Sequence, residues 1–215
     1  MHKIIFSRRA FIVVLLLFSL SFTSCRHKYT PRPRGYFRIS FPKKEYKLYD
    51  EGHPYRFMIP VYAQARLDDD RFSEPHWVNI TIPANKADIH ISYKEISPSE
   101  YYRFGKKQLS AEEAKRAVLM RLTEDSRDLA YKHSVKASAI EEKVFINSKD
   151  KVYGTVYLIK GNAASPMQFY LTDSTRHFLR GALYIREVPN SDSLQPVIKF
   201  LEKDIRKLIE TTQWR

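Results

Sequence analysis

Apolar and more polar side chains alternate along much of the chain. Within residues 77–82, for example, Val78, Ile80 and Ile82 fall on one side of an extended backbone. A period of two is typical of a strand that buries one face. The same pattern, bounded by prolines and turn-forming residues, predicts strands at residues 36–41, 55–59, 77–82, 87–93, 139–146, 152–159, 167–171 and 178–186.

A helix is predicted in the middle of the chain. Ser110 and Glu113 have the spacing of a capping box, in which each side chain accepts a hydrogen bond from the backbone N–H of the other residue. A helix over residues 111–131 follows from this start signal. The apolar positions that fall near one stripe of this helix are Ala114, Val118, Leu122 and Leu129.

The end of the chain has the clearest helical period. Asp192 or Ser193 can cap this helix, and Pro196 is expected in its first turn, where a missing N–H costs little. The continuous apolar stripe consists of Leu194, Val197, Ile198, Leu201, Ile205, Leu208 and Ile209. An amphipathic helix of this kind must pack on another element. Together the elements predict an α+β fold, a largely antiparallel sheet covered by helices in a layered sandwich.

The first 24 residues resemble an export signal. Lys3, Arg8 and Arg9 precede an apolar run at residues 10–22, and Cys25, the only cysteine, follows small residues. This order is typical of a lipoprotein signal peptide, residues 1–24, with a covalent lipid on Cys25. A transmembrane anchor is disfavoured because a span needs about 20 apolar residues. A soluble exported protein is disfavoured because a lone cysteine at the cleavage site would then have little purpose.

Residues 25–35 form a basic, proline-containing tether in this interpretation. Pro31 and Pro33 favour an extended backbone. The candidate membrane-binding cations of this segment are Arg26, Lys28, Arg32 and Arg34. They either contact anionic lipid or belong to a solvated spacer. The remainder, residues 36–215, is predicted to be a single α+β domain.

The charge balance limits the class of partner. The chain carries 37 Lys and Arg against 24 Asp and Glu, and it stays basic after loss of the predicted signal. Nucleic acid is excluded as the partner of an exported protein, so anionic headgroups, peptidoglycan or an acidic protein are expected. The scattered histidines lack metal-ligand spacing and no Gly-rich nucleotide loop occurs, so we expect no metal and no cofactor beyond the lipid on Cys25.

Two segments raise the question of a binding or catalytic site. Asp173, Ser174 and His177 together supply an acid, a hydroxyl and an imidazole, the groups of a hydrolase triad. The favoured interpretation is a turn between strands, because Asp and Ser side chains readily bond to nearby backbone. The aromatic segment 100–104 and the other tyrosines could form a surface for a glycan or peptide, although half-buried strand tyrosines are commoner.

Several blocks of the sequence resemble the gliding motility lipoprotein GldD family. They are Cys25 with residues 29–38, then residues 131–133, 161–165, 168–174 and 177–184. The resemblance implies a Bacteroidota envelope lipoprotein required for gliding and for the associated type IX secretion system, and it implies no catalytic residue. Polar groups in the later blocks are candidate partner-binding residues, namely Asn162, Asp173, Ser174, Arg176, His177 and Arg180. The element order is also similar to the PsbP and Mog1 type of sandwich.

The sequence therefore predicts a non-catalytic accessory or assembly factor that contacts other gliding and secretion lipoproteins and envelope components. A peptidoglycan-binding or glycan-binding lipoprotein is the alternative, and a hydrolase using Asp173, Ser174 and His177 is disfavoured. Arg26 follows the cysteine, which points to the outer membrane if the enterobacterial sorting rule holds. No acidic run follows Cys25 to indicate surface display, so the periplasmic face is favoured.

Overall fold

The computed structural model describes residues 40–104 and 109–215. The predicted signal peptide and tether, with Cys25, Arg26, Lys28, Arg32 and Arg34, lie outside the described residues. So does most of the strand predicted at residues 36–41, of which only Ser40 and Phe41 are described, outside any strand.

The largest element is a seven-stranded sheet with the strand order β3-β4-β5-β9-β8-β7-β6. Every neighbouring pair in this sheet is antiparallel. Its strands are β3 (Gln64–Leu67), β4 (Val78–Ile82), β5 (Ala87–Glu95), β6 (Ala137–Asn147), β7 (Val152–Gly161), β8 (Met167–Thr172) and β9 (His177–Ile185). The predicted strands from residue 77 onward are thus confirmed, with ends shifted by a few residues at most.

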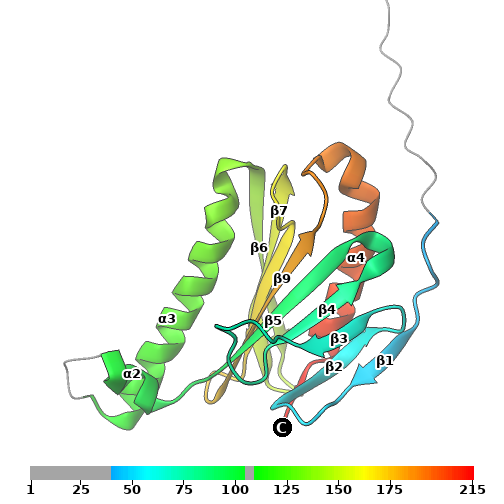
Figure 1. The fold of residues 1–215 in the computed structure, drawn as a ribbon. Coiled ribbons are helices and arrows are strands. Elements are labelled where there is room, and N and C mark those ends of the chain that lie inside the picture. Colours follow the sequence, from blue (N-terminus) through cyan, green and yellow to red (C-terminus); the bar gives the residue numbers. More distant parts are fainter. Residues whose placement is uncertain (1–39, 105–108) are drawn as a thin grey trace, which may run out of the picture. The chain divides into compact units, whose positions relative to one another are not determined.

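A smaller three-stranded sheet has the order β1-β2-β10 and is also antiparallel. It consists of β1 (Tyr46–Tyr49), β2 (Tyr55–Pro60) and β10 (Gln213–Trp214). Only β2 is predicted by the alternating pattern. Because β10 pairs with β2, this sheet places the C-terminal residues beside the β1–β2 hairpin (Figure 1).

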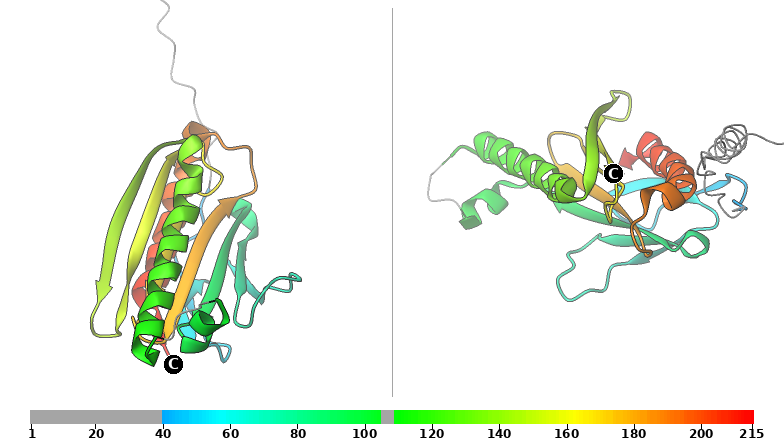
Figure 2. Two further views of the ribbon diagram at one scale, coloured as in Figure 1. Left: turned by 90° about the vertical axis from the view of Figure 1, so that its left-hand side faces the viewer. Right: turned by 90° about the horizontal axis from the view of Figure 1, so that it is seen from above.

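The helices cover opposite faces of the large sheet. α3 (Ala111–Tyr131) lies on one face, preceded by the short α2 (Pro98–Phe104), and α4 (Ser191–Thr211) lies on the other (Figure 2). Single-turn 3-10 segments follow β4 at Pro83–Asn85 and α3 at Lys132–Val135. The result is an α+β layered arrangement with a largely antiparallel sheet, as the sequence predicts.

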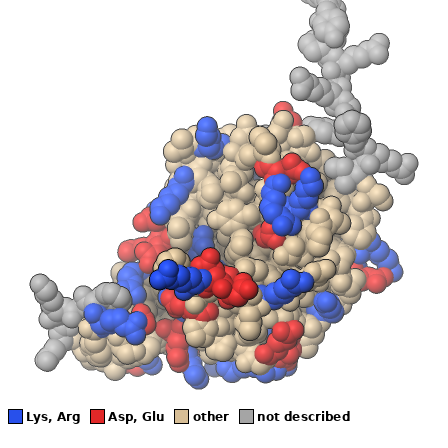
Figure 3. All heavy atoms as spheres, viewed as in Figure 1, with Lys and Arg blue, Asp and Glu red and all other residues tan. Residues whose placement is uncertain are grey.

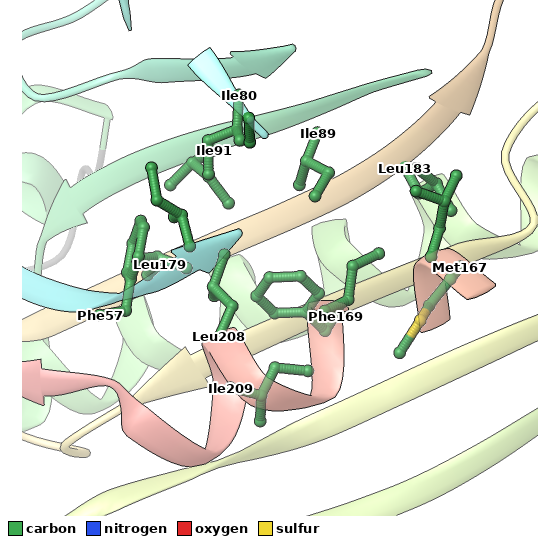
Figure 4. Packing of buried hydrophobic residues seen from close by; sticks show 14 of the residues in the cluster. Phe57, Ile80, Ile89, Ile91, Met167, Phe169, Leu179, Leu183, Leu208 and Ile209 are labelled. Carbon is green, nitrogen blue, oxygen red and sulfur yellow. The ribbon is translucent and has the colours of Figure 1, made fainter. Parts of the chain in front are cut away.

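The main core lies between the sheet and the layer formed by α4 and β2. Phe169 and Leu179 of the sheet meet Leu208 and Ile209 of α4, while Phe57 of β2 closes one end (Figure 4). These side chains are at most 2% exposed. Each fully buried Leu, Ile or Phe side chain contributes about 1.5–3 kcal/mol relative to an exposed one. The predicted apolar stripe of the terminal helix is therefore what attaches α4 to the sheet.

The opposite face packs against α3 through smaller side chains. The buried positions of α3 are Ala114, Val118, Ser126 and Ala130, with Leu122 half-buried between them. Leu129, assigned to the stripe from sequence, is instead 36% exposed. That assignment is wrong because an i, i+4 series from Val118 passes through residues 122, 126 and 130. Small side chains at the last two positions let this end of α3 approach the sheet.

The two helix starts differ in how well they match prediction. The capping box of Ser110 and Glu113 is present. In α4, however, the cap is Asn190, whose side chain accepts a hydrogen bond from the N–H of Ser193, so the predicted Asp192 or Ser193 cap is wrong. The helix therefore begins earlier, and Pro196 lies in the second turn rather than the first.

Candidate functional site

The β8–β9 turn is organised around one carboxylate. Asp173 Oδ1 accepts hydrogen bonds of 2.8–2.9 Å from the backbone N–H groups of Thr175, Arg176 and His177. Burial alone would raise the pKa of Asp173, but these hydrogen bonds hold it below its usual value. Ser174 adopts a left-handed backbone with φ of 66°. The residues form the tight turn that their types favour.

His177 points away from Ser174 and into the protein. Its Nδ1 lies 2.8 Å from the Tyr93 hydroxyl, and its ring stacks on Trp214 at a centroid distance of 5.2 Å. Asp173 uses Oδ1 for backbone N–H groups and Oδ2 for the Thr175 hydroxyl. Among the described residues the three side chains thus form no acid–base–nucleophile relay, which a hydrolase of the triad type requires.

The other candidate residues lie elsewhere. Asn162 belongs to the β7–β8 connection, at the opposite end of β8 from Asp173. Arg180 lies in the middle of β9, where Nη2 donates to Gln168 Oε1 and Nε is buried without a hydrogen-bond partner in the described residues. Burial lowers the pKa of Arg180. The six candidate partner-binding residues therefore do not form one site, and only the turn residues lie together.

Beside this turn is a pocket of about 460 Å³. Its lining, called the charged pocket below, consists of Glu74, Lys94, Glu95, Glu100, Arg103, Val118, Arg121, Leu122 and Asp125. Arg176 connects the pocket to the turn, because its Nε donates to Glu95 Oε1 at 3.0 Å. Its backbone carbonyl also accepts a 2.7 Å hydrogen bond from the N–H of Ile96.

Opposite charges alternate around the charged pocket. Lys94 forms an ion pair with Glu74, and Arg103 lies 3.5 Å from Glu100. Figure 3 shows acidic and basic side chains interleaved over this face of the molecule. The floor is apolar, since Val118 packs with Ile96 and Phe178 in a small buried cluster. Exposed ion pairs contribute little to stability, so these charges are not what holds the fold together.

Aromatic and histidine side chains gather behind the turn. This aromatic cluster contains Tyr49, His53, Tyr55, His76, Tyr93, His177 and Trp214, joined by ring contacts of 5.2–5.9 Å. His53 Nε2 lies 3.0 Å from the Tyr49 hydroxyl, and its Nδ1 lies 3.2 Å from His76 Nδ1. Three of the tyrosines in the cluster, Tyr49, Tyr55 and Tyr93, are therefore buried structural residues and not part of a glycan-binding surface. In the described residues no group of three or more His, Cys, Asp or Glu could hold a metal ion.

Two buried histidines of the aromatic cluster are expected to make stability depend on pH. Burial lowers the pKa of both His53 and His177 below 6.5, so below that pH the unfolded chain binds more protons at these residues than the folded chain. The free energy of unfolding is therefore expected to fall as the pH drops from 7.5 to 5.5. Urea unfolding at both pH values would measure it. His177→Gln should reduce the slope, and an unchanged slope would contradict this assignment.

A comparison with known protein families matches residues 26–214 to the family described as gliding motility lipoprotein GldD. The chain belongs to this family. The match covers the whole described part of this GldD family member except its final residue, including the turn, the charged pocket and the aromatic cluster. In the part of the chain that the structure describes, no helix is long and apolar enough to cross a membrane.

Two further comparisons accompany the family match. Among solved structures, this GldD family chain is similar to cyanobacterial PsbP from Synechocystis sp. PCC 6803, at 12% identity and a TM-score of 0.42. That similarity covers 83% of this chain and 98% of the PsbP chain. A search of curated proteins found no match.

One buried charged site of this GldD family chain was missed from sequence. Asp204 of α4 is 1% exposed, and its carboxylate accepts hydrogen bonds from the hydroxyls of Tyr46 and Tyr62 at 3.0 and 2.7 Å. Lys44 Nζ lies 2.7 Å from the same carboxylate. The signal was available, because Asp204 falls between Leu201 and Leu208 on the apolar stripe. This cluster attaches the first described residues to α4.

Proposed function

We propose that this protein is a non-catalytic accessory factor of the gliding motility and type IX secretion machinery. In this proposal Cys25 carries a lipid that holds the protein on the periplasmic face of the outer membrane. The tether lets the folded body contact other machinery components. The family match over residues 26–214 is the observation that supports the role, since gliding lipoprotein is the family's description. The relation to type IX secretion follows from the resemblance to the family alone.

The charged pocket is the surface that we assign to partner contact. It is hollow, it has an apolar floor, and its rim presents both signs of charge. Such a rim can exchange its internal ion pairs for pairs with a partner, which provides specificity more than affinity. Glu95 and Arg176 are the residues to test because their ion pair lies between the pocket and the turn.

Swapping this ion pair tests the proposed contact. Glu95→Arg combined with Arg176→Glu keeps an opposite-charge pair but reverses its direction. We expect the swapped variant to lose surface spreading, and to lose in-cell crosslinks from the pocket rim to machinery proteins, at unchanged abundance. Both residues are more than half exposed, so the swap should change stability by less than about 0.5 kcal/mol. Full spreading by the swapped variant would contradict a partner contact here.

Three reference strains make that result interpretable. A deletion strain should not spread, and Cys25→Ser should lose both palmitate labelling and membrane attachment. Ser174→Ala should spread normally, because no reaction is assigned to the β8–β9 turn. Loss of spreading in a folded, abundant Ser174→Ala variant would instead favour a hydrolase. Retention of the body on cell-wall sacculi at high salt, without protein crosslinks, would favour a glycan-binding protein.

A further inference from the structure

Strand β6 has a free edge of unusual length. It is 11 residues long, forms one end of the seven-stranded sheet, and pairs only with β7 among the described strands. Figure 2 shows β6 at the outer side of the sheet, between the layers of α3 and α4. The opposite edge strand, β3, has 4 residues. A long edge offers backbone N–H and C=O groups to an incoming strand.

The usual protections of an edge strand are weak here. β6 contains no proline, and its one irregularity in register lies at the start, between Ala137 and Ala139. Glu142, in the middle of the strand, is bound by Arg127 and Tyr131 of α3. Glu141 is bound by Lys160 of β7. Both carboxylates are therefore already paired within the protein and do not protect the edge of β6 from an added strand.

Exposed apolar side chains follow on the α3 side of β6. Ile140 packs with Ala130 and Ile159 beneath the end of α3. Farther along the same face, Val144 and Ile146 are 76% and 67% exposed. Their cross-strand neighbours on β7 are Thr155 and Tyr153. Apolar side chains on an added strand would form cross-strand contacts with Val144 and Ile146 and would remove them from water.

The α4 side of β6 has the opposite chemistry. A groove of about 440 Å³ lies between the β6–β7 hairpin and α4, with Leu158, Pro166 and Ile198 among its apolar lining residues. The cations that line this basic groove are Lys143, Lys160, Lys199 and Arg206, and the lining carboxylate is Glu202. Glu141 forms ion pairs with both Lys143 and Lys160, so these two cations are already neutralised within the protein. Within the described residues Lys199 and Arg206 form no ion pair. Acidic side chains would fit this side.

From these two faces we infer that β6 is the docking edge for an extended segment of a partner protein. In this segment acidic and apolar residues alternate. Because strand side chains alternate between faces, the acidic ones would enter the basic groove while the apolar ones cover Val144 and Ile146. A second copy of this chain fits less well. Antiparallel pairing of two β6 strands about a two-fold axis would bring two basic grooves together on the same face.

A synthetic peptide tests the docking edge on the full lipid-anchored chain in detergent. The probe is a fluorescein-labelled peptide of about nine residues in which glutamate and valine alternate, long enough to span most of β6. We expect saturable binding that weakens with salt, with slowed amide exchange confined to β6. A peptide methylated on alternate backbone nitrogens should bind at least tenfold more weakly. Equal binding of the methylated peptide would overturn the proposal, because strand addition requires those N–H groups.

Variants of the two faces complete the experiment. Lys199→Glu with Arg206→Glu should weaken peptide binding at least tenfold, as should Val144→Lys, which puts a charge on the apolar face. Lys203→Glu with Lys207→Glu is the matched control, since it makes the same charge change on α4 outside the groove lining and should bind normally. Equal loss in both charge variants, absence of binding, or protection at the charged pocket would overturn the proposal. A dimer of this chain that Val144→Lys abolishes would also overturn the proposal, because the edge of β6 would then be occupied by a second copy of the chain.

Discussion

Asp204→Ala is expected to lower the free energy of unfolding by about 3 kcal/mol, the lower end for breaking a buried ion pair. The substitution removes the partner of Lys44 and leaves the hydroxyls of Tyr46 and Tyr62 without their acceptor. The Lys44 side chain is 25% exposed, so water partly compensates for the lost carboxylate. Chemical denaturation of the full chain would measure the loss.

Two further variants separate charge from packing in this cluster. Lys44→Met combined with Asp204→Leu removes both charges, and we expect it to be less destabilising than Asp204→Ala because no uncompensated charge remains. Glu210→Ala changes an exposed carboxylate of the same helix and should alter stability by less than about 0.5 kcal/mol. If the double variant were the least stable of the three, the uncompensated charge would not explain the loss of stability in Asp204→Ala.

The longer elements could be predicted because local pattern and final burial agree in them. In β5, Ile89, Ile91 and Tyr93 are buried on one side, as the period of two requires. The stripe of α4 packs on the sheet for the same reason. Where every second residue of a strand, or every third or fourth residue of a helix, enters a core, the sequence alone predicts the element.

The short strands could not be predicted because their stability comes from distant partners. β3 has no buried side chain and is a strand only because it pairs with β4. β10 follows α4 directly and pairs with β2, at positions 157 and 159 residues earlier in the chain. Local propensity does not report such pairings. For residues 100–104 the sequence favours half-buried strand tyrosines over an aromatic surface, whereas the segment lies in helix α2. There Tyr101 packs against the small apolar cluster under α3 and Tyr102 is exposed.

The candidate sites also divide into those that local sequence predicts and those that depend on distant residues. The β8–β9 turn is local, and the tendency of Asp173 to bond to nearby N–H groups is visible in its sequence neighbours. The charged pocket is not local, because its lining residues come from the β3–β4 connection, β5, α2 and α3 and meet only in the folded protein. The edge position of β6 depends on strand order, which alternation does not encode.

One glycine of the sheet is required by a neighbour that sequence patterns could not reveal. Gly181 of β9 lies opposite Phe169 of β8 on the face that packs against α4. A Cβ at residue 181 would lie 2.2 Å from Phe169 Cζ and 2.3 Å from Cε1. Phe169 is 1% exposed and has little room to move. The glycine therefore provides space for the ring.

Gly181→Ala is accordingly expected to cost about 1–3 kcal/mol through overpacking. Phe169→Ala should cost about 3–5 kcal/mol, because it leaves a cavity where the ring was. In the Phe169→Ala background the added Gly181→Ala should cost less than about 1 kcal/mol, because the clashing ring is gone. A double-mutant cycle by urea denaturation would measure this coupling. Additive losses would mean that Gly181 is needed for its backbone and not for the space that it leaves to Phe169.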